Sequence, residues 1–128
     1  MINKNLKKLK ALIADDEDSN QICLTVALEK EGWEVKQAKD GQEAIEKVLA
    51  WQPDLLILDN QMPKLTGAEV YQYLQLQRIK LAVVMISGDS KLEKIASDLG
   101  IAYYLQRPFD MAEFIQTINS AYENFLKQ

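Results

Sequence analysis

Polar side chains that could transfer a phosphoryl group follow the apolar runs of this 128-residue chain. Asp15 and Asp16 follow "ALIA", Asp59 follows "LLIL", Ser87 follows "AVVMI", and Arg107 comes shortly after "IAYYL". Clustered carboxylates repel one another unless a cation separates them, and oxygen ligands of this kind suit Mg²⁺ or Mn²⁺. A hydroxyl and a guanidinium nearby would bind the remaining oxygens of a phosphoryl group. The pattern therefore favours Asp59 as a nucleophile that forms an aspartyl phosphate.

Each of these residues, taken alone, has a simpler structural explanation. Acidic residues after strands often cap helices, which is the interpretation that we prefer for Asp18 and Asp110. Ser87 alone would be a turn residue, and Arg107 alone would be a solvated surface charge. Their coincidence with Asp59 at successive strand ends is what favours the functional interpretation.

The elements that would position these side chains alternate between strand and helix. Apolar runs predict strands at 11–14, 55–58, 82–86 and 101–105, and an alternating pattern predicts an edge strand at 33–38. Unbroken apolar strands are typical of parallel sheets that are covered on both faces. Strand and helix repeated five times predict a three-layer α/β sandwich with right-handed crossovers. In such a sheet, the residues that follow the strands meet at one edge.

Helical periodicity between the strands predicts where each helix starts and which side faces the sheet. The residues expected to start the helices are Ser19, Asp40, Thr66, Ser90 and Asp110. In the first helix, the residues expected to face the core are Ile22, Cys23, Val26 and Ala27. In the last helix, they are Met111, Phe114, Ile115, Ile118, Tyr122 and Phe125.

Composition narrows the class of protein. A hydrophobic fraction of 48% and a net charge of −4 indicate a globular protein with no electrostatic reason to bind nucleic acid. The chain has no histidine, which excludes Ser-His-Asp triads and His-ligated zinc. Its one cysteine, Cys23, fits a reducing cytoplasm. No apolar run approaches the roughly 20 residues of a membrane span, and residues 1–8 are expected to form a short basic leader rather than a signal peptide.

Four segments give the chain a resemblance to the receiver domain of two-component response regulators. They are "LIADDEDSN", "PDLLILDNQMPKLTG", "VVMISGD" and "YYLQRPF", spread from about Leu9 to Phe125. The second segment is specific, because it joins an apolar strand, an aspartate, Met-Pro and a glycine at fixed spacing. The resemblance implies a flavodoxin-like fold with strand order 2-1-3-4-5. It also implies a single receiver domain over 1–128, with its core at about 9–125.

The resemblance gives the acidic residues their roles. Asp59 corresponds to the phosphoacceptor of the family. Asp16 corresponds to a direct Mg²⁺ ligand, and Asp15 acts on the same ion through water. The backbone carbonyl of Gln61 would be the third protein ligand. The cofactor implied for the chain is therefore Mg²⁺ or Mn²⁺.

The resemblance also implies a switch and two tuning residues. Ser87 corresponds to the hydroxyl residue that follows the phosphoryl group and draws its loop inward. Tyr104 corresponds to the aromatic residue that turns inward when that loop moves. Gln61 and Asp89 flank the acyl phosphate in the family pattern, where they tune its lifetime.

A receiver of this kind is a signalling switch, with self-phosphotransfer and slow autodephosphorylation as its only catalysis. A histidine kinase or histidine phosphotransfer protein of the cytoplasm would supply the phosphoryl group. The changed surface, around the last two helices and the last strand, would bind a downstream protein target or an output domain. Direct contact with nucleic acid or a membrane is not expected. Homodimerisation, the pathway, and whether the chain acts alone or within a larger regulator stay open.

Arg107 departs from the family pattern, which has a lysine before the proline at this position. Arginine keeps the positive charge, but it is planar, bulkier and not interchangeable with a compact ammonium group. We expect phosphorylation to survive the change, at an altered rate or with altered coupling to the switch. The alternative is a pseudo-receiver, which would bind proteins without being phosphorylated.

Two further alternatives conflict with particular residues. Haloacid-dehalogenase-like phosphatases carry a second aspartate two residues after the nucleophile, where this chain has Gln61, which cannot act as the general acid. A flavodoxin would bind a cofactor phosphate after the first strand. The carboxylates of "DDEDSN" would repel that phosphate.

Overall fold

The computed structural model describes residues 8–128, along which strands and helices alternate. The strands are β1 (Lys10–Ala14), β2 (Glu34–Ala38), β3 (Leu55–Asp59), β4 (Ala82–Ser87) and β5 (Tyr104–Gln106). The helices are α1 (Asp18–Lys30), α2 (Gly41–Trp51), α3 (Gly67–Leu76), α4 (Leu92–Leu99) and α5 (Met111–Leu126). The predicted basic leader lies outside the described residues, apart from Lys8.

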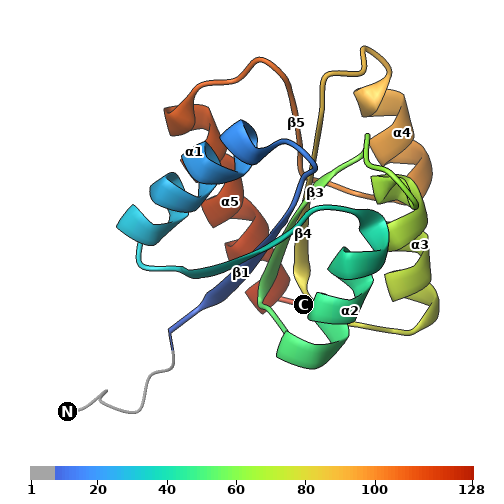
Figure 1. Ribbon diagram of the computed structural model, residues 1–128, viewed down its shortest axis with the longest axis horizontal. Coiled ribbons are helices and arrows are strands. Elements are labelled where there is room, and N and C mark those ends of the chain that lie inside the picture. The colour runs from blue at the N-terminus through green and yellow to red at the C-terminus, as the bar shows by residue number, and fades with distance from the viewer. Residues whose placement is uncertain (1–7) are drawn as a thin grey trace.

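The five strands form one parallel sheet in the order β2-β1-β3-β4-β5, which confirms the predicted flavodoxin-like α/β fold. Helices α1 and α5 cover one face of this sheet, and α2, α3 and α4 cover the other (Figure 1). Strand β5 is shorter than predicted, because only residues 104–106 pair with β4 as a strand. Among residues 8–128, no helix combines the length and the apolar composition that crossing a bilayer requires.

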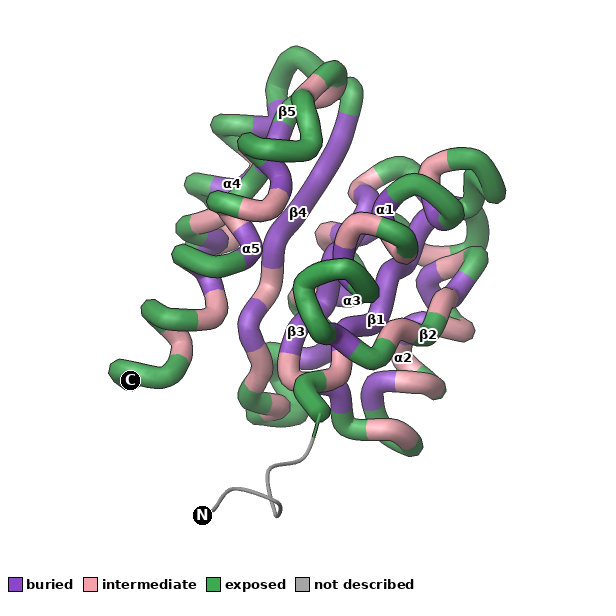
Figure 2. The backbone as a smooth tube through the Cα atoms, turned by 90° about the vertical axis from the view of Figure 1, so that its left-hand side faces the viewer, coloured by how far each residue is buried: buried purple, intermediate pink, exposed green. Residues whose placement is uncertain are grey.

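Two apolar layers fill the space on either side of the sheet. Successive residues of a strand point to opposite faces. Ile13 and Ile57 therefore pack towards α1 and α5, while Leu12 and Leu56 pack towards α2, α3 and α4. Figure 2 shows the buried central strands lying between helices whose outer sides are exposed. Because β3 is buried along its whole length, it delivers Asp59 to the carboxyl edge from inside the core.

Three of the five helices start at the predicted capping residue. Those that accept a hydrogen bond from the backbone N–H three residues later are Asp40, Thr66 and Asp110. Three expectations were wrong. Helix α4 follows Lys91 rather than Ser90. Helix α1 follows Glu17, so Ser19 does not start it and Asp18 lies inside it instead of capping it. Gly100 ends α4, with a left-handed φ of 79° that favours glycine.

The predicted inward face of α1 was wrong at three of its four residues. Ile22, Cys23 and Val26 are exposed, and only Ala27 packs against the core. The residues of α1 that are buried against the sheet are Gln21, Leu24 and Leu28. Apolar residues occupy both sides of this helix, so periodicity alone does not select the buried side. In α5, Met111 is likewise exposed, whereas the stripe from Phe114 onwards packs against the sheet as predicted.

Candidate functional site

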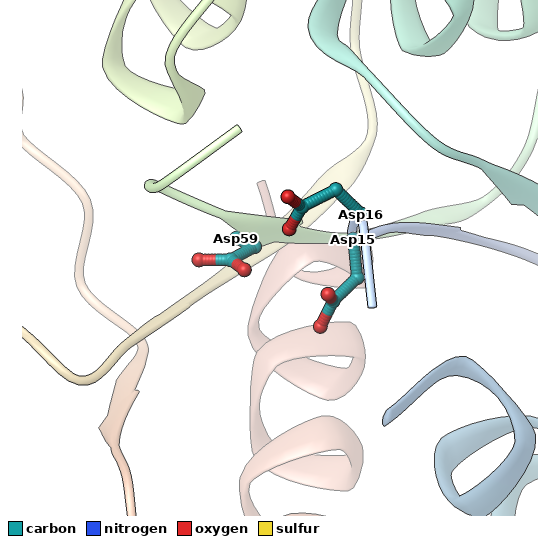
Figure 3. Close-up of side chains that lie close together, drawn as sticks. All are labelled: Asp15, Asp16 and Asp59. Carbon is teal, nitrogen blue, oxygen red and sulfur yellow. The ribbon is translucent and has the colours of Figure 1, made fainter. Parts of the chain in front are cut away.

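Three carboxylates meet at the carboxyl edge of the sheet, where β1 and β3 end (Figure 3). One oxygen from each of Asp15, Asp16 and Asp59 lies within 4.8 Å of the other two. Asp15 and Asp59 are buried, whereas Asp16 is exposed to solvent. The structure thus brings together the acids that sequence analysis singled out, although Asp59 is more than forty residues from the other two along the chain.

Asp15 is held in place by hydrogen bonds from two elements. Its side-chain Oδ1 accepts the backbone N–H of Glu17 at 2.9 Å, and its own N–H donates to the carbonyl of Ala38 at 3.0 Å. Gln21, buried in α1, donates its amide to the carbonyl oxygens of Asp15 at 2.6 Å and Ala38 at 2.8 Å. Gln21 therefore ties the acidic loop to α1 and to β2.

Sequence analysis missed Gln21. The available signal was its helical spacing, three and seven residues before the two buried leucines of α1. A polar residue in an inward-facing stripe implies a buried hydrogen-bond partner.

Asp59 is fixed by the loop that joins β3 to α3. Its Oδ1 accepts the backbone N–H of Gln61 at 3.0 Å. Asn60 accepts the N–H of Gly67 at 3.1 Å through its carbonyl and that of Ala68 at 2.9 Å through its side chain. Gly67 lies against the strand end so closely that a Cβ there would approach the carbonyl oxygen of Asp59 to 2.6 Å. Close packing, rather than conformational freedom, requires glycine at this position.

Arg107 reaches into the acidic cluster from the end of β5. Its Nη2 lies 2.6 Å from Oδ2 of Asp15, and its Nη1 lies 3.5 Å from Oδ2 of Asp59. The guanidinium therefore spans the two buried carboxylates and supplies their opposing charge. The backbone N–H of Arg107 donates to the carbonyl of Ser87 at 2.9 Å, which aligns the loop after β5 with the end of β4. Sequence analysis placed Arg107 at this edge but did not predict its contact with Asp15.

Burial raises the pKa of Asp59 from 3.8 to about 6. Loss of hydration is the main cause, and the negative charge of Asp15 adds to it. The N–H of Gln61 and the guanidinium of Arg107 act in the opposite direction. Asp59 is therefore mostly charged at neutral pH but poorly hydrated, a state that suits a nucleophile.

The remaining candidate residues lie around this cluster. Ser87 ends β4 and is buried, with its hydroxyl accepting the N–H of Asp89 at 3.1 Å. Asp89 is half-buried in the following loop, and Gln61 is exposed beside Asp59. Tyr104 lies on the edge strand β5 with 37% of its surface exposed, so its ring is not turned into the core here.

The acidic cluster fits a divalent cation on two grounds. All three acidic side chains offer oxygen ligands, which Mg²⁺ and Mn²⁺ prefer. The three carboxylates also gather negative charge in one place, which a divalent cation would offset.

Known proteins resemble this chain in both sequence and fold. Residues 11–119 match the family model of the response regulator receiver domain. The chain is 37% identical over 106 residues to the alkaline phosphatase synthesis transcriptional regulatory protein PhoP of Bacillus subtilis. The aligned residues cover 81% of this chain and 44% of that protein. It is 36% identical over 118 residues to the transcriptional regulatory protein PdtaR of Mycobacterium tuberculosis, covering 91% of the chain and 58% of that protein. The chain thus spans about half the length of these relatives.

A solved structure with the same fold is the receiver domain of the Francisella response regulator 1452. It superposes with a TM-score of 0.83 at 27% sequence identity, covering 91% of this chain and 98% of that one.

Proposed function

The chain belongs to the response regulator receiver domains, and from that premise we propose that it is a phosphorylation-controlled switch with Asp59 as the phosphoryl acceptor. The observation that carries the proposal is the setting of this carboxylate, which is only 4% exposed and lies beside two further acids and Arg107. Burying an acid among acids is costly to the fold. A capping role does not account for it, because Thr66 caps the helix that follows.

The proposed transfer is an in-line displacement at phosphorus. An oxygen of Asp59 attacks the phosphorus of a phosphohistidine on the donor protein. The new P–O bond forms as the P–N bond breaks, and the imidazole leaves with the bonding electron pair and takes a proton from solvent. The guanidinium of Arg107 and the hydroxyl of Ser87 bind the phosphoryl oxygens, so the chain contributes position and charge rather than further covalent chemistry.

Mg²⁺ or Mn²⁺, when held by Asp16, Asp59 and the carbonyl of Gln61 and by Asp15 through water, would neutralise the charge of the phosphoryl oxygens. Slow hydrolysis of the acyl phosphate resets the switch. Gln61, which is exposed beside Asp59, and Asp89, in the loop after β4, tune how readily water reaches the phosphorus.

A protein donor is supported by an exposed apolar patch on α1, formed by Ile22, Cys23 and Val26. Helix α1 begins two residues after Asp16, so a protein that presents a phosphohistidine to Asp59 has to cover this rim of the sheet. We propose that a histidine kinase or a histidine phosphotransfer protein of the cytoplasm docks on the patch. Exposed apolar side chains that are grouped together commonly mark such contacts.

Ile22→Asp tests the docking patch, and Leu126→Asp is its matched control. The two side chains are 62% and 61% exposed, but Leu126 lies at the far end of α5. The donor is the protein that labels the wild-type chain fastest in a panel of purified phosphorylated kinases and phosphotransfer proteins. Ile22→Asp is expected to slow this transfer by about tenfold, the loss typical of a central interface residue, without changing labelling by acetyl phosphate. Equal transfer to the two variants would refute docking at α1.

The proposed output is a change of surface on α4, β5 and α5. The hydroxyl of Ser87 follows the new phosphoryl group, and its loop moves inward. Tyr104, exposed in this structure, then turns into the space that the loop vacates. The altered surface binds a downstream protein target or an output domain, so phosphorylation biases a two-state equilibrium.

Intact-mass spectrometry tests the phosphoacceptor. The chain is incubated with acetyl phosphate and Mg²⁺ beside Asp59→Asn, and a donor kinase serves as a second phosphoryl source. We expect one added phosphoryl group on the wild type and none on the variant. Equal labelling of both proteins would show that another residue accepts the phosphoryl group.

Arg107 favours one second candidate, a pseudo-receiver that binds partners without being phosphorylated. Its guanidinium already spans Asp15 and Asp59, where a family member with lysine has a smaller cation. A wild-type chain that takes a phosphoryl group from neither donor, and that does not bind the phosphoryl mimic beryllofluoride, would favour this candidate.

A further inference from the structure

We propose that Arg107 is an internal counter-ion of the acidic cluster, which must leave Asp15 before a divalent cation can bind. Metal binding and release of the guanidinium would then be one coupled event. The inference rests on the proposed function, because it concerns the same carboxylates. It gives Arg107 a positioning role in the resting state, before any phosphoryl group arrives.

The hydrogen-bond pattern of the two buried acids carries the proposal. In Asp15, Oδ1 accepts the backbone N–H of Glu17 and Oδ2 accepts Nη2 of Arg107. In Asp59, Oδ1 accepts the backbone N–H of Gln61 and Oδ2 faces Nη1 of Arg107. In both acids, therefore, Arg107 contacts the oxygen that the backbone leaves free.

The shorter of the two contacts is with Asp15 rather than with the proposed phosphoacceptor. Nη2 lies 2.6 Å from Asp15, whose side chain is fully buried, whereas Nη1 lies 3.5 Å from Asp59. The guanidinium thus occupies a carboxylate oxygen of the acidic cluster, where a metal ion or a water bound to it would otherwise lie.

Electrostatic repulsion makes the two occupants exclusive. A divalent cation and a guanidinium on the same carboxylates would lie a few ångströms apart in a site with little water, where like charges repel strongly. The side chain of Arg107 is 24% exposed, so it has a path towards solvent when it leaves. Once free, the guanidinium becomes available for the oxygens of a phosphoryl group on Asp59. A lysine ammonium is a point charge and lacks the planar fork that spans two carboxylates.

Binding of Mn²⁺ to the unphosphorylated chain tests the proposal. Electron paramagnetic resonance of free Mn²⁺ gives the dissociation constant for the wild type, Arg107→Lys and Arg107→Gln, and circular dichroism checks that each variant is folded. Arg107→Gln is expected to bind Mn²⁺ about tenfold or more tightly than the wild type, because one charge-assisted hydrogen bond and one like charge are removed. Arg107→Lys is expected to fall between them, because it keeps the charge but loses the fork.

Nitrogen-15 NMR of the guanidinium groups gives a readout independent of the variants. The sequence contains two arginines, and the exposed Arg78 serves as the internal reference. Addition of Mg²⁺ is expected to shift the Arg107 signals and to speed their exchange with water, while those of Arg78 stay unchanged. Saturation with Mg²⁺ without any change at Arg107 would overturn the proposal.

Three outcomes of the Mn²⁺ binding measurement would contradict the inference. Dissociation constants that agree within about threefold in all three proteins would overturn the inference, as would failure of every variant to bind Mn²⁺. Tighter binding by Arg107→Gln, with Arg107→Lys equal to the wild type, would reduce the effect to charge alone and overturn the bridging role.

Labelling of the same samples with acetyl phosphate separates this inference from the proposed function. If all three proteins bind Mn²⁺ equally and Asp59 is labelled, the proposed function stands and the inference about Arg107 is refuted. If the Mn²⁺ affinities follow the expected order but Asp59 is not labelled, the inference stands and the proposed function is refuted.

Discussion

Replacing Asp59 with asparagine is expected to stabilise the folded chain at neutral pH. Burial raises the pKa of Asp59 from 3.8 to about 6 in the native state, whereas in the unfolded chain the group titrates near its ordinary value. Between about pH 4 and pH 6, the native state therefore binds more protons than the unfolded state. The free energy of unfolding then falls as the pH rises through this window. Above about pH 6, the charged carboxylate lowers the free energy of unfolding by a constant amount.

The difference between 3.8 and about 6 corresponds to about 3 kcal/mol of unfolding free energy. Asparagine keeps an oxygen that can accept the N–H of Gln61, but it loses the ionic contact with Arg107. We therefore expect Asp59→Asn to raise the free energy of unfolding by about 1–2 kcal/mol at pH 7.5. At pH 4 the gain should be below about 0.5 kcal/mol, because the wild-type carboxyl is then protonated.

Urea unfolding between pH 4 and pH 8 in the presence of a chelator measures this gain, with the fluorescence of the buried Trp33 and the half-buried Trp51 as the signal. Asp16→Asn is the matched control, because it removes a charge from the same cluster at an exposed position. Its effect should be clearly smaller, since Asp16 remains hydrated in the folded state. An Asp59→Asn chain no more stable than the wild type at pH 7.5, or a gain equalled by Asp16→Asn, would refute burial as the cause.

Two further substitutions are expected to lower stability, both measurable by urea unfolding. Gly67→Ala forces a Cβ against the carbonyl oxygen of Asp59 and should lower the free energy of unfolding by about 1–3 kcal/mol. Gly88→Ala is its control, because a Cβ there meets no atom within 4 Å, and it should change the free energy of unfolding by less than about 0.5 kcal/mol. Gln21→Leu removes the amide that binds two buried backbone carbonyls, one of them of Asp15, and should cost about 1–3 kcal/mol. Equal effects of the two glycine substitutions, or a Gln21→Leu chain as stable as the wild type, would contradict these assignments.

Local patterns in the sequence were enough to predict the architecture. Continuous apolar strands separated by helical stretches require a parallel sheet covered on both faces, because each strand then has to be buried on two sides. The carboxyl ends of parallel strands meet at one edge, so residues that directly follow those strands converge. Asp15, Asp16, Asp59 and Ser87 could therefore be placed at this edge from the sequence. Asp110 could be assigned as a helix cap, because capping is a contact between near neighbours in the chain.

The buried side of α1 could not be predicted in the same way. Apolar residues lie on both sides of the helix, and the side that packs on the sheet contains Gln21 rather than Ile22 or Val26. The carbonyl oxygens of Asp15 and Ala38 accept the amide of Gln21 and so make its burial favourable. Those carbonyls are brought together only when β1 and β2 pair.

The sequence by itself determined the order of the elements, the sheet edge that carries the site and the identity of its charged residues. Tertiary structure alone decided which charges touch. Arg107 binds Asp15, which is 92 residues away along the chain, more closely than Asp59, which is 48 residues away. The reach of one guanidinium across two strand ends depends on the distance and angle between β1, β3 and β5. Those distances are set by sheet pairing and by packing against the helices, and no spacing along the sequence encodes them.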